Sequence, residues 1–224
     1  MGQEPKMAGP AELVEALSKA TGLPLPTVVD IDRRLVKAGL RTKGGRGLNA
    51  ARMTALDAAR LLTAIIGSPQ ANASAEAVCR YAETHVDRRR SSEGLFSGVE
   101  VNDLARLSPR HSFVDGLAAL IASASEGDLA ALAAGSRNRW QPHIEVYAFT
   151  RATYGRIRLS EMPNGKTANA EYTSARTANE RAAQNALGRK KGTLIGEAQG
   201  DLEQSRRITE RTILAIANLL AEES

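Results

Sequence analysis

Apolar residues recur every three or four positions in the first 67 residues and predict three helices. In the first helix, Pro10 stands at the start, and Gly22 allows a left-handed backbone at the end. The second helix is expected to begin near Thr27, a candidate N-cap, and to end at Ala38 and Gly39. The apolar faces of these two helices carry Leu13, Val14, Leu17, Val28, Ile31 and Leu35.

The third helix is expected between Thr54, which can cap it, and Gly67. The segment before it, residues 40–52 (LRTKGGRGLNAAR), has three closely spaced glycines and predicts a flexible loop or hairpin. After Gly67, the polar segment 68–74 (SPQANAS) is typical of a linker. We therefore expect residues 1–67 to form an N-terminal domain.

Residues 74–160 are predicted to be helical at first and to end in a β-hairpin. Segment 112–124 has an apolar stripe at helical spacing, whereas apolar and polar residues alternate in 143–150 and again in 156–160, as in half-buried strands. Residues 164–192 contain almost no large apolar side chain, and residues 161–200 are therefore predicted to be a flexible basic arm or a weak, exposed helix.

The last segment, residues 201–224, is predicted to be an amphipathic helix. Ile213, Ile216 and Leu220 lie on one stripe of it, and a chain in water seldom leaves such a stripe bare. Either a second copy of the chain covers it, which makes the helix an oligomer interface, or the hairpin of the same chain does. The sequence leaves both alternatives open.

Composition and charge narrow the range of partners. Hydrophobic residues make up 42% of the chain but aromatic residues only 4%, and the net charge of +5 favours an anionic partner such as nucleic acid. Cys79 is the only cysteine, so neither an intramolecular disulfide nor a cysteine zinc site is expected. No segment has the length and apolar character of a signal peptide or a membrane span, and we expect a cytoplasmic protein without membrane contact.

Positive charge concentrates between residues 33 and 60, where the sequence has eight basic residues and a single acidic one, Asp57. The eight are Arg33, Arg34, Lys37, Arg41, Lys43, Arg46, Arg52 and Arg60.

The run GLPLPTVVDI (residues 22–31) resembles the helix-turn-helix signature of many bacterial repressors. It has a glycine in the turn, an apolar residue after it, Thr-Val at the start of the next helix and an apolar residue three positions further on. The following KAGLRTKGGRG (37–47) resembles the exit from a recognition helix into a basic wing, and ARMTALDAARLL (51–62) resembles the helix that closes small winged modules.

This resemblance covers residues 12–66 and implies a mainly α fold. In it, an N-terminal winged helix-turn-helix is followed by a helical region with a β-hairpin and by a C-terminal amphipathic helix.

The resemblance also implies double-stranded DNA as the partner. The expected DNA-binding residues are Thr27, Asp30, Arg33, Arg34, Lys37, Arg41, Lys43, Arg46 and Arg52. Where repressors of this kind have residues that read bases, this chain has Leu25, Pro26 and Asp30, none of them an Arg, Asn or Gln. We therefore expect the basic residues to supply affinity through phosphates, and the wing or the groove shape to supply specificity.

No motif for catalysis or for cofactor binding is evident in the sequence. GGRG lacks the spacing and the Lys-Ser/Thr pair of a phosphate loop, and His85, His111 and His143 lie in separate segments without metal-ligand spacing. We expect neither an enzyme nor a metal or cofactor site.

These features predict a transcriptional regulator of bacterial or prophage origin that binds DNA as a homo-oligomer, a dimer or higher. A phage DNA-packaging protein, similar to small terminase subunits that join a helix-turn-helix to an oligomerising helical region, is the alternative. Stoichiometry separates the two, since a regulator should be a dimer or tetramer and a packaging subunit a ring of about eight or more.

Overall fold

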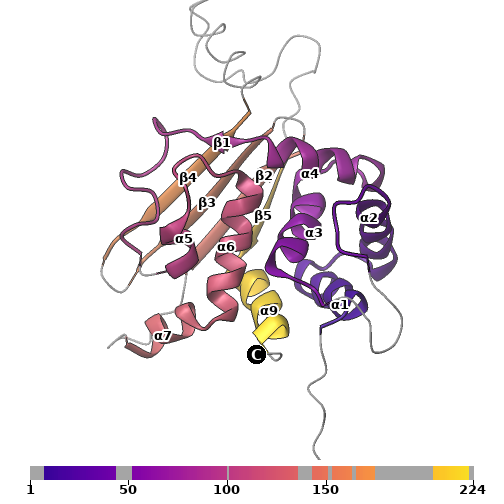
Figure 1. Cartoon of the computed structure of the whole chain (residues 1–224), viewed down its shortest axis with the longest axis horizontal. Helices are drawn as coiled ribbons and strands as arrows, with labels where there is room; N and C mark the ends of the chain where they lie inside the picture. The colour runs from indigo at the N-terminus through magenta and orange to yellow at the C-terminus, as the bar shows by residue number, and fades with distance from the viewer. Residues whose placement is uncertain are drawn as a thin grey trace, which may run out of the picture.

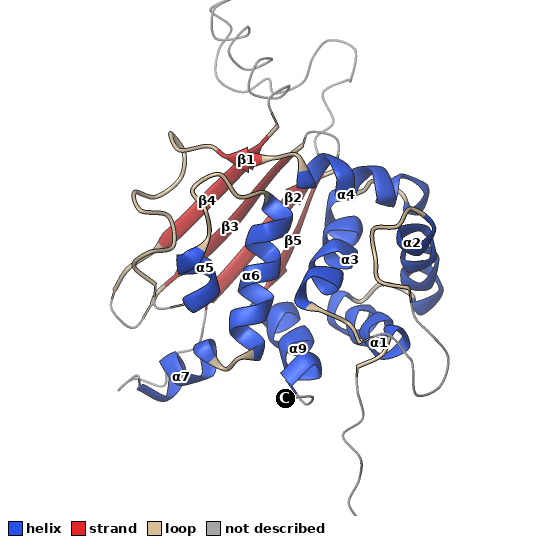
Figure 2. Cartoon of the chain, viewed as in Figure 1, coloured by secondary structure: helices blue, strands red, loops and turns tan. Residues whose placement is uncertain are grey.

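A five-stranded antiparallel sheet with the strand order β1-β4-β3-β2-β5 forms one layer of the molecule, and the helices form the other (Figures 1 and 2). Its strands are β1 (His85–Val86), β2 (His143–Phe149), β3 (Tyr154–Ser160), β4 (Ala168–Thr173) and β5 (Ser205–Thr209). The computed structural model describes residues 8–43, 52–99, 101–135, 143–150, 153–162, 165–174 and 204–221.

Eight α-helices lie within these described residues. They are α1 (Pro10–Thr21), α2 (Leu25–Lys37), α3 (Ala55–Gly67), α4 (Ser74–Ala82), α5 (Asn102–Arg106), α6 (Phe113–Ser125), α7 (Asp128–Gly135) and α9 (Glu210–Ala221). The fold is therefore mixed, and the expectation of a mainly α protein is met only roughly, because the sheet is larger than the single predicted hairpin.

The predicted helices α1, α2 and α3 are present, but one predicted cap is wrong. Gly22 ends α1 with a φ of 74°, as expected, and Thr54 caps α3 in a capping box with Asp57. Helix α2, however, begins at Leu25 with Pro24 as its N-cap, and Thr27 lies in its first turn. Prolines suit these first positions because the backbone N–H groups there have no partner within the helix.

The segment predicted to be a linker, residues 68–74, is buried at both ends, although Pro69, Gln70 and Asn72 between them are exposed. Ser68 is buried, and a short 3-10 turn, Ala71–Ala73, leads directly into α4. Helix α3 packs on α4 and α6, so apolar residues from both sides of the expected boundary belong to one continuous core. Residues 10–67 thus share their core with the rest of the chain, although the sequence pattern alone favours a separate domain there.

The hairpin of β2 and β3 is confirmed, with Val146 opposite Ile157. Gly155 in β3 allows the helices to come close, because a Cβ there would lie 2.7 Å from the ring of Phe113 in α6. Part of the predicted arm is in fact strand β4, which places Tyr172 in the core. Residues 163–164 and 175–200 of that arm lie outside the described residues.

The C-terminal segment differs from the single helix that was predicted. Residues 205–209 form the edge strand β5, and only then does α9 begin. Ile213 and Ile216 are fully buried, since α9 packs against α6 and α1. The chain itself therefore covers this apolar stripe, mainly with helices and less with the hairpin.

No single helix among the described residues is long and apolar enough to cross a membrane. The neighbouring helices Phe113–Ser125 and Asp128–Ala134 reach that length and composition only together, with a bend of 56° between them.

The burial of α9 predicts a large effect of truncating one of its core side chains. Ile216→Ala should lower the free energy of unfolding by about 2–5 kcal/mol, because it removes fully buried methyl groups and leaves a cavity. Urea unfolding followed by circular dichroism measures this, and Asn218→Ala at an exposed position of the same helix is the control. Two variants of equal stability would contradict the packing of α9 in the core.

Candidate nucleic-acid interface

Helix α2 separates its apolar and basic residues onto two faces. Its apolar side chains, Val28, Ile31 and Leu35, are buried. Arg33, Arg34 and Lys37 are exposed on the outer side. The helix lies at the edge of the molecule that is farthest from the sheet (Figure 1), so this basic side faces solvent among the described residues.

Two of the predicted site residues on α2 interact with each other. The Nε of Arg34 donates to Oδ2 of Asp30 over 2.9 Å, and both side chains are almost half exposed. A surface pair of this kind is worth at most about 1 kcal/mol, so it does not keep Arg34 from a stronger anion. Thr27 is half-buried in the first turn of α2.

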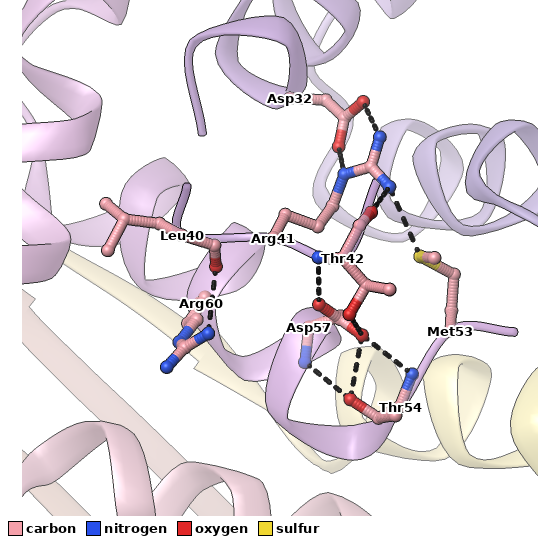
Figure 3. Close-up of polar contacts among 8 residues, drawn as sticks. All are labelled: Asp32, Leu40, Arg41, Thr42, Met53, Thr54, Asp57 and Arg60. Atoms are coloured by element: carbon pink, nitrogen blue, oxygen red, sulfur yellow. Dashed lines mark hydrogen bonds and ion pairs between the residues drawn. The ribbon is translucent and has the colours of Figure 1, made fainter. Parts of the chain in front are cut away.

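Arg41 is not on the basic surface, which corrects the prediction that it contacts DNA. Only 7% of this residue is exposed, and its Nη2 donates to Oδ2 of Asp32 over 2.7 Å while Nε contacts Oδ1 of the same carboxylate (Figure 3). Nη1 donates to the carbonyl of Thr42 over 2.9 Å and lies 3.5 Å from the sulfur of Met53. Arg41 therefore balances a buried charge and is unavailable to phosphates.

The sequence contained a signal for this pair. Asp32 stands four residues after Val28 and three before Leu35, which places it on the buried face of α2. A buried carboxylate needs a cation, because an unpaired charge is costly away from water. Burial raises the pKa of Asp32, and the Arg41 guanidinium opposes that rise.

A second carboxylate, Asp57, joins the two chain segments next to the predicted wing (Figure 3). Its Oδ1 accepts from the backbone N–H of Thr42 at 2.9 Å, and its Oδ2 accepts from the hydroxyl and the backbone N–H of Thr54 at 2.8 and 3.1 Å. Burial by itself raises the pKa of Asp57, but these hydrogen bonds outweigh it and hold that pKa below its ordinary value.

The structure describes only part of the predicted wing. Arg46 lies in residues 44–51, outside the described residues, and the described residues on either side, 40–43 and 52–54, form no strand. Lys43 and Arg52 are exposed at the two ends of this gap. Arg60 holds the residues before this gap by donating a hydrogen bond to the carbonyl of Leu40 over 3.1 Å.

The predicted site thus divides into two groups. The first group consists of exposed basic residues on α2 and at the ends of segment 44–51, namely Arg33, Arg34, Lys37, Lys43 and Arg52. Arg41 is buried, and together with Asp32 and Asp57 it fixes the position of segments 40–43 and 52–57 relative to α2. This arrangement can hold a polyanion against a rigid surface.

The histidines and carboxylates of the described residues do not form a metal site, since no group of three or more lies close enough to hold an ion. His111 is used inside the core, where its Nε2 lies 2.8 Å from the hydroxyl of Tyr172 and its Nδ1 lies 2.6 Å from the carbonyl of Ser108. Burial lowers its pKa.

The role of Asp57 predicts a stability that depends on pH. A carboxyl group whose pKa is lower in the folded than in the unfolded state stabilises the fold at pH values above its unfolded-state pKa of about 3.9. This stabilisation is lost as the pH falls through the pKa of the folded state. Asp57→Asn should therefore cost about 1–3 kcal/mol at pH 7 and lose less stability than the parent on acidification.

Chemical unfolding at a series of pH values from 7 to about 3 tests this prediction. Asp30→Asn, at an exposed position of α2, is the matched control and should change the unfolding free energy by less than about 1 kcal/mol. If parent and Asp57→Asn lost the same stability on acidification, the hydrogen bonds to the Asp57 carboxylate would not stabilise the fold.

Comparisons of the chain with protein-family models, with curated proteins and with solved structures give no match. The resemblance to helix-turn-helix proteins therefore rests on the sequence alone, chiefly on the motif in residues 22–31. What this part of the molecule does has to follow from its exposed chemistry.

Proposed function

We propose that the protein is a transcriptional regulator that binds double-stranded DNA through α2 and the ends of segment 44–51, with residues 10–67 acting as a winged helix-turn-helix. One observation carries the proposal: apart from the buried Arg41 and the half-buried Arg60, the described basic residues of this region are exposed on α2 and beside segment 44–51, while the carboxylates Asp32 and Asp57 are buried and paired within the protein. Asp30 is the acidic side chain of this region that stays exposed, so the outer surface is basic.

The dimensions of α2 suit a major groove. Its 13 residues give a rod about 20 Å long, and a groove about 12 Å wide admits a single helix. At its N-terminus, Pro26 is exposed and Leu25 is 42% exposed, so both can reach thymine methyl groups. Farther along, Arg33 and Lys37 are one helical turn apart and suit phosphates on the groove edge.

In this mode of binding, the contacts to phosphates would position the protein, and few contacts would read the bases. Asp30 is the one charged residue near the start of α2, and it is engaged with Arg34. The first turn has no Arg, Asn or Gln for guanine or adenine, and its side-chain hydrogen-bond donor is the half-buried hydroxyl of Thr27. We expect sequence preference to come from groove width and from the wing, as in proteins that read DNA shape.

A regulator with so few phosphate contacts gains from acting as an oligomer, because pairing multiplies the contacts and matches a two-fold site. The aliphatic stripe of α9 is used inside the chain, so the pairing surface has to lie elsewhere. Light scattering with and without duplex DNA measures the stoichiometry. A ring of about eight or more copies would support the packaging protein in place of the regulator.

The phosphate contacts predict a salt-dependent affinity. Replacing Arg33, Lys37 and Lys43 together by alanine should make the plot of log affinity against log salt shallower by about 0.9 per contact, or about 2.7 in all, because fewer counterions are released. Fluorescence anisotropy with a labelled random-sequence duplex at several salt concentrations gives this slope.

A control with the same change in charge is available elsewhere on the surface. Arg89, Arg106 and Arg110 are exposed and lie far along the chain from α2. The variant with alanine at these three positions should keep the slope of the parent. The same reduced slope in both triple variants would mean that only net charge matters, and the proposed interface would be wrong.

A further inference from the structure

The second face of the sheet is separate from the interface on α2. Side chains alternate along β2, and those that point toward the helices, Ile144, Val146 and Ala148, are buried. The neighbouring strands continue this inner row, since Val146 lies opposite Ile157 on β3 and Ile208 on β5. The intervening residues point away from the helices, and no described helix packs on that side (Figure 2).

Aromatic side chains gather on this outer face, although the chain has few of them. Tyr147 and Phe149 come from β2 and Tyr154 from β3, and all three are partly exposed. The rings of Phe149 and Tyr154 lie 5.0 Å apart between centroids. The other described aromatic residues, Tyr81, Phe96, Phe113 and Tyr172, are completely or almost completely buried. Core packing therefore does not explain why three rings lie on the outer face.

Arginines surround these rings. The guanidinium of Arg156 lies 4.7 Å from the ring centre of Tyr147, and Arg207 stands opposite Tyr147 in register on β5. The side chains of Arg158 and Arg207 are 45% and 54% exposed, and both contact a single carboxylate, Glu145, at 4.0 and 2.9 Å. One glutamate shared by two arginines leaves positive charge available to an anion.

The second carboxylate of this face, Glu171, is paired at the edge of the sheet. Glu171, opposite Arg156 on β4, lies 3.8 Å from Arg90, which belongs to the loop after β1. Among the described residues, the strands of this face therefore carry three arginines and two glutamates, while Arg90 at the edge lies between Glu171 and Asp87. Its charge is complementary to a polyanion.

We propose that the outer face of β2, β3 and β5 is a binding site for single-stranded nucleic acid. Bases would stack on Tyr147, Phe149 and Tyr154, and the backbone phosphates would contact Arg156, Arg158 and Arg207. Unpaired bases offer flat faces that stack on aromatic rings and on arginine planes, which a duplex keeps inside. This site is independent of the proposed duplex-binding function of α2.

A second copy of the chain suits this face less well. In a two-fold pairing the same patch meets itself, so that arginines of one copy approach arginines of the other. Like charges facing each other across an interface are unfavourable. A polyanion with unpaired bases satisfies both the charge and the rings of this face, and we therefore take it as the occupant.

Anisotropy titrations with two labelled probes of about 12 nucleotides, oligothymidylate and oligouridylate, test the proposal and separate DNA from RNA as the ligand. The double variant Tyr147→Leu/Phe149→Leu keeps apolar side chains on the strand but removes two rings. It should weaken binding of the preferred probe by about tenfold or more, while duplex binding stays unchanged. Tyr147→Phe keeps the ring and should bind the probe like the parent.

The reciprocal variant distinguishes the two sites. Alanine at Arg33, Lys37 and Lys43 should reduce duplex binding and leave the single-strand probes unaffected. Because ring substitutions can disturb the sheet, Arg158→Gln/Arg207→Gln, at exposed positions, is a second variant and should also weaken the probes severalfold. Binding of neither probe by the parent, or an equal loss of duplex and probe affinity in the ring variant, would overturn the proposal. So would a change in the molar mass of the unliganded ring variant, because it would assign this face to contact between copies.

Discussion

The burial of α3 on nearly all sides is the constraint on which the rest of the structure depends. From Ala58 to Gly67 only Arg60 is not fully buried, a pattern typical of a helix surrounded by protein. Helices α2, α4 and α6 and strands β2 and β5 all pack against it. A helix in this position is shared between residues 10–67 and the rest of the core. The continuous core, and the packed connection from Gly67 into α4, both follow from it.

The same helix carries the polar contacts that shape the candidate interface. Asp57 lies in its first turn and accepts hydrogen bonds from both Thr42 and Thr54, so the chain on either side of segment 44–51 is fixed to a buried element. Asp32 and Arg41 fix the same region to α2. Basic residues that are held in place before a partner binds lose less conformational freedom on binding, which favours affinity.

Much of the helical layer could be predicted from the sequence, because periodicity and capping are local. Gly22, Thr54 and the stripes of α1, α2, α3 and α6 are read from neighbouring residues alone. Strand β4 could not be read in this way, since its inward residues include two alanines, which suit a strand only where another element comes close. Strand β5, SRRIT, has one apolar residue, and it forms because β2 offers an unpaired edge.

The candidate site could be predicted only as a count of charges, since burial decides what each charge does. Arg41 and Lys43 are two residues apart, yet the first neutralises Asp32 inside the protein and the second is exposed. Two adjacent arginines of strand β5 also have different roles. Arg206 points toward the helices and donates to the carbonyl of Ile65 near the end of α3, while Arg207 points outward to Glu145. Register and packing decide which of two neighbouring arginines supports the fold and which is available to a ligand. Residues far away in the sequence set the register and the packing.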